Sequence, residues 1–180
     1  MAQEKQTPEE REAAGKPPCG RIAMRAWHSA GFLKISVSDD GRGISESAVR
    51  EKILEKRLAA LDGGAAALTV SSGTAAIAFT VLNILRAGDE LVSANNLYGG
   101  TYTQFDAILP QYGIKTRFAK VNDFAATEAA INDRTRALYI ETVGNPALDV
   151  ADMEEYSKIA RRHHLPLIVD STFTPPTLLK

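Results

Sequence analysis

The sequence predicts an α/β fold with a mainly parallel sheet, preceded by a β-hairpin. Three observations predict it. Strand-type and helix-type segments alternate from about residue 66 to the end of the chain, which is typical of a parallel sheet. A segment with helical spacing precedes them, from about residue 46. Nearer the N-terminus, two short runs alternate apolar and polar side chains around a turn, as the strands of a hairpin do.

Composition and charge are those of an ordinary soluble globular protein. Of the 180 residues, 44% are hydrophobic and 24% are charged, which argues against disorder over the whole chain. The formal net charge of −1 shows no basic excess, so we expect no nucleic-acid partner. Cys19 is the single cysteine, which suits a reducing compartment. The sequence has no secretory-type segment and no apolar stretch long enough for a bilayer, so we expect a cytoplasmic chain without a membrane partner.

The first forty-five residues predict a short helix followed by the hairpin. Thr7 is an expected N-cap, with Pro8 at the first helical position and Glu10 closing a capping box. The Gly-Lys-Pro-Pro run from Gly15 ends this helix. The alternating runs predict strands at 21–27 and 32–37, a turn at 28–31 between them and a second turn at 39–43.

The rest of the chain predicts alternating helices and strands. A helix at 46–60 has an apolar stripe made of Val49, Ile53, Leu54, Leu58 and Leu61. The elements expected after it are a strand at 66–70, a helix at 74–86, a strand at 90–94, a helix at 100–109, a strand at 115–120, a helix at 124–131, a strand at 136–141, a helix at 152–163 and a strand at 166–170. We expect the second helix to be buried on most sides, because its residues are almost all apolar. Pro110 is expected to end the third helix.

Polar and aromatic residues follow the expected strands. In a parallel sheet, ligands bind beyond the carboxyl ends of the strands, so these residues should meet at one rim. Gly73 and Thr74 open a helix, whose free N–H groups and dipole suit a phosphate. Tyr98 can stack its ring on a flat heterocycle. Asp170 can pair with a protonated ring nitrogen, and Thr172 can pack on the other face of that ring.

Each of these features also has a purely structural interpretation. The Ser-Ser-Gly-Thr run at 71–74 is also a common N-cap sequence. Tyr98 can serve as a loop anchor, and Asp170 can cap the next turn. His163 and His164 are adjacent at a helix end, where they favour interaction with the helix dipole over a metal site. We therefore assign no metal ligand.

Five segments together resemble one family. They are LEKRLAALDGG at 54–64, SSG at 71–73, YGGT at 98–101, ETVGNP at 141–146 and DSTF at 170–173. Their order and spacing resemble the pyridoxal-phosphate (PLP) enzymes of Cys/Met metabolism, and most closely the O-acetylhomoserine sulfhydrylases. Those enzymes join O-acetylhomoserine and sulfide to give homocysteine. The resemblance implies the first part of a type I, aspartate aminotransferase-like large domain over about 54–180.

The resemblance also implies a cofactor, a substrate class and site residues. The cofactor would be PLP, and the substrate a small amino acid. The implied contacts are backbone N–H groups of Gly73 and Thr74 with the phosphate, Tyr98 stacked on the pyridine ring, Asn145 near the ring hydroxyl or substrate, Asp170 with the pyridine nitrogen, and Thr172 against the ring.

The sequence departs from the family at the catalytic lysine. In the family, the Schiff-base lysine lies in a Ser-x-Thr-Lys segment that follows the Asp-x-Thr strand. No such segment occurs up to Lys180, and Lys180 itself lacks the expected neighbours. The substrate-binding arginine and the Tyr-x-Arg segment are not found either. We therefore expect an incomplete enzyme and assign no catalytic residue.

The N-terminal part resembles a different family. PEER at 8–11, AGKPP at 14–18 and ISVSDDGRGI at 35–44 are similar to the ATP-binding domain of chemotaxis-type histidine kinases. In that resemblance, Asp39 would contact the adenine amino group, while Gly41 and Gly43 would shape the pocket. The simplest interpretation is a chimera of a kinase-like part at 1–53 and a PLP-enzyme part at 54–180.

Three hypotheses about function follow. The chain is a partial PLP-binding domain with weak or no catalysis, an ATP-binding fragment, or an inactive chimeric fragment that associates through exposed surfaces. An incomplete sheet leaves open edges and bare apolar faces, so we expect a homo-oligomer or an aggregation-prone chain.

Overall fold

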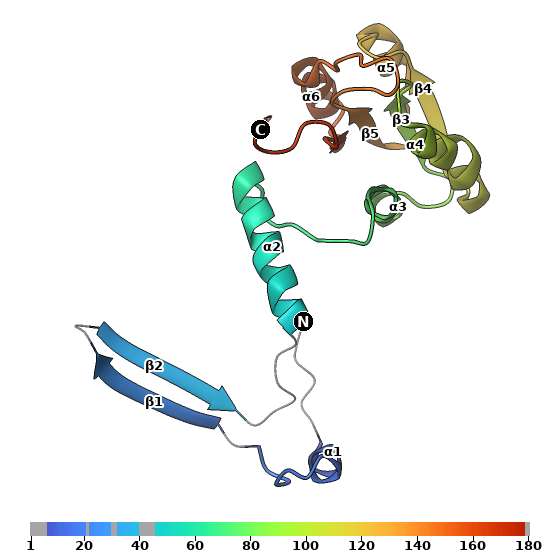
Figure 1. The fold of residues 1–180 in the computed structure, drawn as a ribbon. Helices are drawn as coiled ribbons and strands as arrows, with labels where there is room; N and C mark the ends of the chain where they lie inside the picture. Colours follow the sequence, from blue (N-terminus) through green and yellow to red (C-terminus); the bar gives the residue numbers. More distant parts are fainter. Residues whose placement is uncertain (1–6, 21, 30–31, 40–45, 179–180) are drawn as a thin grey trace. The chain divides into compact units, whose positions relative to one another are not determined.

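The chain divides into two compact units, Met1–Leu54 and Glu55–Lys180 (Figure 1). The structure is a computed structural model that describes residues 7–20, 22–29, 32–39 and 46–178. Each unit has its own secondary structure, and the helix α2 (Glu46–Asp62) runs across the division.

The first unit begins with the helix α1 (Pro8–Ala13), which has the predicted capping box. The Glu10 N–H donates to the Thr7 hydroxyl at 3.3 Å, and the Thr7 N–H donates to the Glu10 carboxylate at 3.0 Å. The Arg11 guanidinium donates to the carbonyls of Pro17 at 2.8 Å and Cys19 at 3.2 Å, so it ties the following stretch to the helix. This contact explains why Arg11 is buried although it is charged.

The predicted hairpin is confirmed. Strands β1 (Ile22–Ser29) and β2 (Phe32–Asp39) pair antiparallel, with Ile22 opposite Asp39 and Ser29 opposite Phe32. The prediction of a turn starting at residue 28 is wrong, because residues 28 and 29 still pair with β2. Asp39 ends β2, whereas the predicted nucleotide residues Gly41 and Gly43 lie outside the described residues.

The helix expected at 46–60 is confirmed as α2, which extends to residue 62. Its expected apolar stripe is largely exposed, with Ile53 at 53% and Leu54 at 49% exposure. The apolar spacing therefore predicted the helix correctly, but it did not predict that the apolar side of the helix is largely exposed.

The strand predicted at 66–70 is wrong. These residues have no regular secondary structure and belong to none of the described strands, and Leu68 is exposed. The Thr69 N–H and hydroxyl both donate to Oε1 of Glu55, at 3.1 and 3.3 Å. A side-chain carboxylate thus satisfies a backbone donor that a strand would pair in a ladder.

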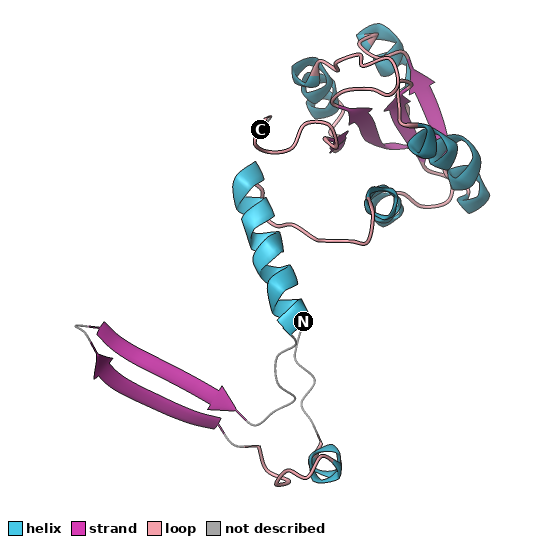
Figure 2. Cartoon of the chain, in the orientation of Figure 1, coloured by secondary structure: helices cyan, strands magenta, loops and turns pink. Residues whose placement is uncertain are grey.

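The second unit contains a four-stranded parallel sheet in the order β4-β3-β5-β6 (Figure 2). Its strands are β3 (Glu90–Ala94), β4 (Lys115–Ala119), β5 (Thr135–Glu141) and β6 (Leu167–Asp170). The predicted α/β class and mainly parallel sheet are confirmed. The two central strands, β3 and β5, are almost entirely buried.

Helices and helical turns connect the strands and cover both faces of the sheet (Figure 1). They are α3 (Gly73–Ile84), α4 (Gly99–Thr103), the π turn η1 (Gln104–Ile108), the 3-10 turn η2 (Leu109–Tyr112), α5 (Phe124–Ala130) and α6 (Met153–Arg162). Successive residues of β5 point to opposite faces, so Tyr139 packs with α3, η1 and η2, whereas Leu138 packs with α6. Within the described residues, no helix is long and apolar enough to cross a membrane.

Two helix predictions need correction. The helix expected at 100–109 does not end before Pro110, because helical backbone continues through η1 and η2 to Tyr112. Pro110 sits near the start of η2, where its missing N–H costs no hydrogen bond, and Gly113 ends the turn with a φ of 75°. Helix α3 is not buried on most sides. Val81 is buried, but Phe79 is 60% exposed.

Candidate functional site

A pocket of about 340 Å³ lies at the carboxyl ends of β5 and β6. It is lined by all of the cofactor-binding residues predicted from the sequence: Gly73, Thr74, Tyr98, Asn145, Asp170 and Thr172. The remaining wall is made of Ile77, Thr101, Glu141, Val143 and Phe173. The topology thus brings together residues that are almost 100 positions apart in the sequence, as expected for the rim of a parallel sheet.

The first turn of α3 forms one wall of the pocket. Ser72 caps this helix, since its hydroxyl accepts from the Ala75 N–H at 3.1 Å. The N–H groups of Gly73 and Thr74 precede the first residue that can reach a carbonyl within the helix. A Cβ added at Gly73 would meet nothing within 4 Å, so a ligand can approach the backbone closely there. This wall offers N–H donors and the positive end of a helix dipole.

Tyr98 is held by its backbone next to the pocket. Its N–H donates to Oε1 of Glu141 at 2.8 Å, and its carbonyl accepts from the Tyr102 N–H at 2.9 Å. The ring is 55% exposed and lies against Gly100, where an added Cβ would stand 2.6 Å from Cε1 of the ring. The loop-anchor interpretation therefore describes the backbone of Tyr98, and the ring remains available to a ligand.

The Asp170 carboxylate is oriented by three donors. Its Oδ2 accepts from the Tyr139 hydroxyl at 3.1 Å. Its Oδ1 accepts from the Thr172 N–H at 2.9 Å and from the Thr172 hydroxyl at 2.6 Å. Asp170 does bond the turn that follows it, as the structural interpretation expected, yet it also lines the pocket.

Tyr139 supports Asp170 from inside the sheet. Its side chain is buried and packs edge-on against Phe105, with ring centroids 4.8 Å apart. Burial raises the pKa of the Tyr139 hydroxyl far above its usual range, and the nearby carboxylates of Asp170 and Glu141 raise it further. The phenol therefore keeps its proton and can only donate to Asp170.

Asn145 reaches the pocket from a tightly packed loop. Its neighbour Gly144 donates its N–H to the Asp149 carbonyl at 2.9 Å. A Cβ added at Gly144 would lie 2.1 Å from Nδ2 and 2.5 Å from the carbonyl of Asn96, so a larger residue does not fit there without a shift. The glycine of the ETVGNP segment thus allows the Asn145 loop to pass close to the loop after β3.

Glu141 is the pocket residue whose role the sequence reasoning missed. It is the last residue of β5, it pairs in register with Asp170 of β6, and it is 6% exposed. Burial raises the pKa of Glu141 and the Asp170 charge adds to that rise, while the Tyr98 N–H opposes both. The sequence carries no signal for this role, because the partner of Glu141 is the backbone N–H of Tyr98, 43 residues away.

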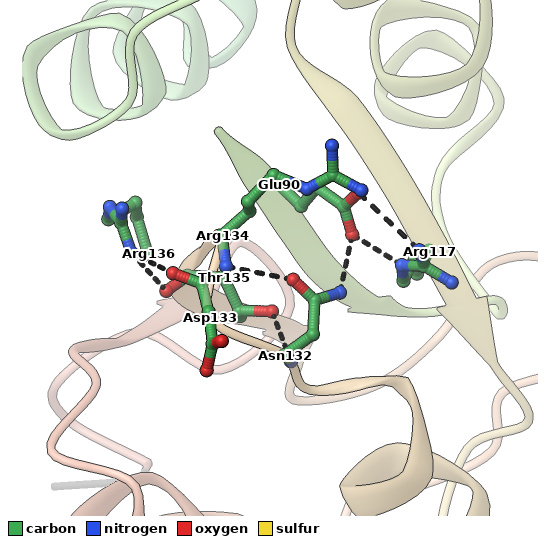
Figure 3. A network of polar contacts seen from close by, with 7 residues as sticks. All are labelled: Glu90, Arg117, Asn132, Asp133, Arg134, Thr135 and Arg136. Atoms are coloured by element: carbon green, nitrogen blue, oxygen red, sulfur yellow. Dashed lines mark hydrogen bonds and ion pairs between the residues drawn. The ribbon is translucent and has the colours of Figure 1, made fainter. Parts of the chain in front are cut away.

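The amino edge of the same sheet carries a separate polar network (Figure 3). The Glu90 carboxylate is buried and accepts hydrogen bonds from the Arg117 guanidinium and from Asn132 Nδ2 at 2.7 Å. It also forms an ion pair with Arg134, whose Nη2 lies 3.2 Å from Oε1. The hydrogen bonds from Arg117 and then Asn132 lower the pKa of Glu90 to about 2. This network joins the starts of β3 and β5 to β4. It therefore lies at the opposite end of the strands from the pocket.

His163 and His164 are not among the residues that line this pocket. His163 follows α6, and its Nε2 is 3.4 Å from Oε1 of Glu128. His164 has a φ of 54° in the turn that follows. Among the described residues, no group of three or more His, Cys, Asp or Glu side chains could hold a metal ion.

The protein thus has an α/β fold with a pocket at the carboxyl ends of the strands of a parallel sheet. The model of one family, the Cys/Met metabolism PLP-dependent enzymes, matches residues 47–180. The chain belongs to this family, and the matched range begins within α2, after the hairpin.

Individual proteins that are similar to the chain support the same family assignment. The chain is 46% identical over 127 residues to the O-acetyl-L-homoserine sulfhydrylase of Leptospira meyeri, an alignment that covers 71% of this chain and 29% of that protein. The structure of the O-acetylhomoserine sulfhydrylase of Wolinella succinogenes is similar with a TM-score of 0.70 and 42% identity, over 73% of this chain and 37% of that one. Cystathionine gamma-lyase from Lactobacillus plantarum is similar with a TM-score of 0.66 and 38% identity, over 68% and 32% of the two chains. The chain thus spans less than a third of the length of the curated relatives that it matches.

Proposed function

We propose that residues 55–178 form the phosphate-binding and ring-binding wall of a PLP site in an O-acetylhomoserine sulfhydrylase-type enzyme. One observation carries the proposal. The residues assigned to PLP from the family resemblance all line a single pocket. The volume of that pocket, about 340 Å³, lies in the range of small-molecule and cofactor sites.

The residues present fit the chemistry of PLP. A phosphate is an anion, and the first turn of α3 presents N–H donors at the positive end of a helix dipole. The pyridine ring is flat and aromatic, and the exposed Tyr98 ring offers a stacking surface. The ring nitrogen is cationic when protonated, and Asp170 offers a carboxylate with a fixed orientation.

PLP, when bound, supplies an electron sink for carbanion chemistry at an amino acid. The residues of this chain would bind and orient it. Asp170 would hold a proton at the ring nitrogen, and the Tyr139 and Thr172 hydroxyls would keep that carboxylate in place. Asn145 would bind near the ring hydroxyl or the substrate, and Thr172 would lie against the ring.

The proposed function is cofactor binding, and no residue is assigned to catalysis. We propose an amino-acid substrate of the O-acetylhomoserine type, because the sulfhydrylase relatives are 46% and 42% identical to the chain over the matched regions. No lysine among the 180 residues lies in the family's Ser-x-Thr-Lys context, so none is assigned the Schiff base.

An absorbance titration with PLP tests this proposal. We expect a saturable visible band with the wild-type chain. Asp170→Asn keeps the size of the side chain but removes its charge, so it should weaken PLP binding by about tenfold or more, in line with the loss of a charge-assisted hydrogen bond. Asp106→Asn is the matched control, because Asp106 is exposed on η1 and does not line the pocket.

Borohydride reduction and mass mapping complete the experiment. Reduction traps any lysine joined to PLP, and mapping places it in the sequence. Slow, scattered labelling of surface lysines, equal in the wild type and both variants, would contradict a PLP site at this pocket. Circular dichroism of each variant verifies that it is folded.

Other expectations from the sequence stay predictions. Self-association is supported by exposed apolar side chains, among them Phe79 on α3. The cytoplasmic location is compatible with one exposed cysteine, Cys19. The ATP-binding hypothesis rests on Asp39, Gly41 and Gly43, of which the two glycines lie outside the described residues.

A further inference from the structure

Two contacts within the chain fix the position of Tyr98. The first is the hydrogen bond from the Tyr98 N–H to Glu141 at 2.8 Å. The second is the close approach of the Tyr98 ring to Gly100, where the space for a Cβ is already filled by ring atoms. The Tyr98 side chain makes no capping hydrogen bond to α4.

We propose that Glu141 and Gly100 are positioning residues that hold the Tyr98 ring on the pocket wall. The proposal rests on the proposed function, since it assigns these residues to the orientation of the ring that would stack on PLP. Glu141 fixes the backbone from which the ring projects, and Gly100 leaves the gap that the ring occupies.

The location of Glu141 supports this role. It ends a central strand, where it pairs in register with Asp170 of β6, and the next residue, Thr142, donates its N–H to the Asp170 carbonyl at 2.9 Å. Its carboxylate is buried next to Asp170, a position in which a carboxylate is costly unless it accepts hydrogen bonds. The Tyr98 N–H is the donor that Glu141 has here, which ties a loop residue to the rigid sheet.

The same arrangement couples the two ring-binding groups. Glu141 and Asp170 are register partners on adjacent parallel strands. Through Glu141, the Tyr98 segment is therefore anchored beside the carboxylate that would meet the ring nitrogen. A stacking ring and an in-plane carboxylate must keep a fixed relation if both are to contact one heterocycle, and a rigid connection removes the ordering cost at binding.

Gly100 and Gly99 provide a matched pair of substitutions. A Cβ at Gly100 would lie 2.6 Å from Cε1 of Tyr98, so Gly100→Ala must displace the ring. A Cβ at Gly99 would meet nothing within 4 Å, so Gly99→Ala adds the same methyl group without displacing it. Both positions lie in the first turn of α4, and the effect of alanine on helix formation is therefore similar.

The first test uses NMR of the full chain without PLP. In the wild type we expect a protected Tyr98 amide and a nuclear Overhauser effect between the Tyr98 ring and the Gly100 Hα protons. Glu141→Ala should speed exchange of the Tyr98 amide by about tenfold or more, because the amide loses its acceptor. Glu141→Gln keeps an acceptor oxygen and should restore protection. Equal exchange in all three chains would overturn the role of Glu141.

The second test measures PLP binding by the same variants. Glu141→Ala and Gly100→Ala should each weaken PLP binding by about tenfold, whereas Glu141→Gln and Gly99→Ala should stay near the wild-type affinity. If the wild type binds PLP and all variants bind it equally, the positioning role is wrong and the proposed function stands. If the wild type does not bind PLP, the proposed function fails, and the NMR test still decides whether Glu141 and Gly100 hold the ring.

Discussion

Two glutamates on neighbouring strands of the sheet lie in opposite electrostatic environments. Glu90 begins β3, accepts hydrogen bonds from Arg117 and Asn132 and forms an ion pair with Arg134, and these partners hold its pKa at about 2. Glu141 ends β5 with one backbone N–H and a neighbouring carboxylate, and its pKa is raised. Both side chains are buried. The two pKa values shift in opposite directions because the partners differ: Glu90 contacts two arginines, whereas Glu141 lies beside the acidic Asp170.

The comparison separates a structural site from the proposed ligand site. At the amino edge, positive side chains already neutralise the buried carboxylate, so nothing is left for a ligand to satisfy. At the carboxyl edge, the Asp170 carboxylate lines a pocket that is also lined by the first turn of α3, with its N–H groups. A cationic heterocycle with an anionic substituent would complement both features.

The largest expected effect is on stability at the amino edge. Glu90→Gln should lower the free energy of unfolding at neutral pH by about 2–3 kcal/mol, because it removes charge-assisted hydrogen bonds to a buried carboxylate. Urea denaturation at neutral pH measures this change. Glu128→Gln, at an exposed pair with Arg162, is the control and should change stability much less. A Glu90→Gln chain as stable as the wild type would contradict a stabilising role for the network around Glu90.

The same pair predicts a dependence on acid. Glu90 has a lowered pKa in the folded state, so its contribution is present above the unfolded value, about 4.3, and is lost as pH falls towards about 2. The stability difference between the wild type and Glu90→Gln should therefore shrink as pH falls through that window. A difference that stays constant from neutral pH to about pH 2 would contradict the lowered pKa.

A second expected effect concerns the Asn145 loop. Gly144→Ala would place a Cβ 2.5 Å from the Asn96 carbonyl, so the backbone of one loop must move. We expect a loss of about 1–3 kcal/mol in the free energy of unfolding, as for other overpacked sites. The control is Gly64→Ala, whose Cβ would meet its nearest atom at an ordinary 3.7 Å. Thermal unfolding of the two variants decides whether this close approach is required.

A third expected effect separates binding from stability at the pocket. Gly73→Ala adds a Cβ that meets no protein atom within 4 Å, so it should leave the melting temperature unchanged or slightly raised. The same methyl group would stand between the phosphate and the helix start, so PLP binding should weaken by about tenfold. Unchanged PLP affinity in this variant would argue against phosphate binding at α3.

The smallest expected effect is a pH-dependent gain in stability. Burial raises the folded-state pKa of Glu141, so this residue costs stability as pH rises above its unfolded value. Glu141→Gln removes that cost and should stabilise the chain more at neutral pH than at about pH 4. Melting temperatures of the wild type and the variant at the two pH values measure the sign. Greater stabilisation at the lower pH would contradict it.

Much of the second unit was predictable because its signals are local. The alternation of apolar runs and helical segments located β3 to β6, and the glycine, aromatic and acidic residues after each strand located the pocket. The carboxyl ends of parallel strands meet at one edge, so residues predicted separately had to converge. The capping box of α1 was predictable for the same reason, since it depends on residues within one turn.

The errors came from contacts that are distant in sequence. Residues 66–70 look like a strand, but Glu55 satisfies the Thr69 N–H in place of a neighbouring strand. The α3 sequence looks fully buried, yet the part of the chain that the structure describes leaves Phe79 exposed. The role of Glu141 was missed because its partner, the Tyr98 N–H, is a backbone group 43 residues away that no side-chain pattern reveals.

The most direct test of a PLP site at the carboxyl edge is a backbone NMR map of the chain titrated with PLP. We predict saturable shifts at Gly73, Thr74, Tyr98, Asp170 and Thr172, and none at the amino-edge network around Glu90. The Asp170→Asn chain should require about tenfold more PLP for the same shifts. Shifts spread over surface lysines, or shifts at Glu90 without shifts at Gly73 and Asp170, would contradict the account.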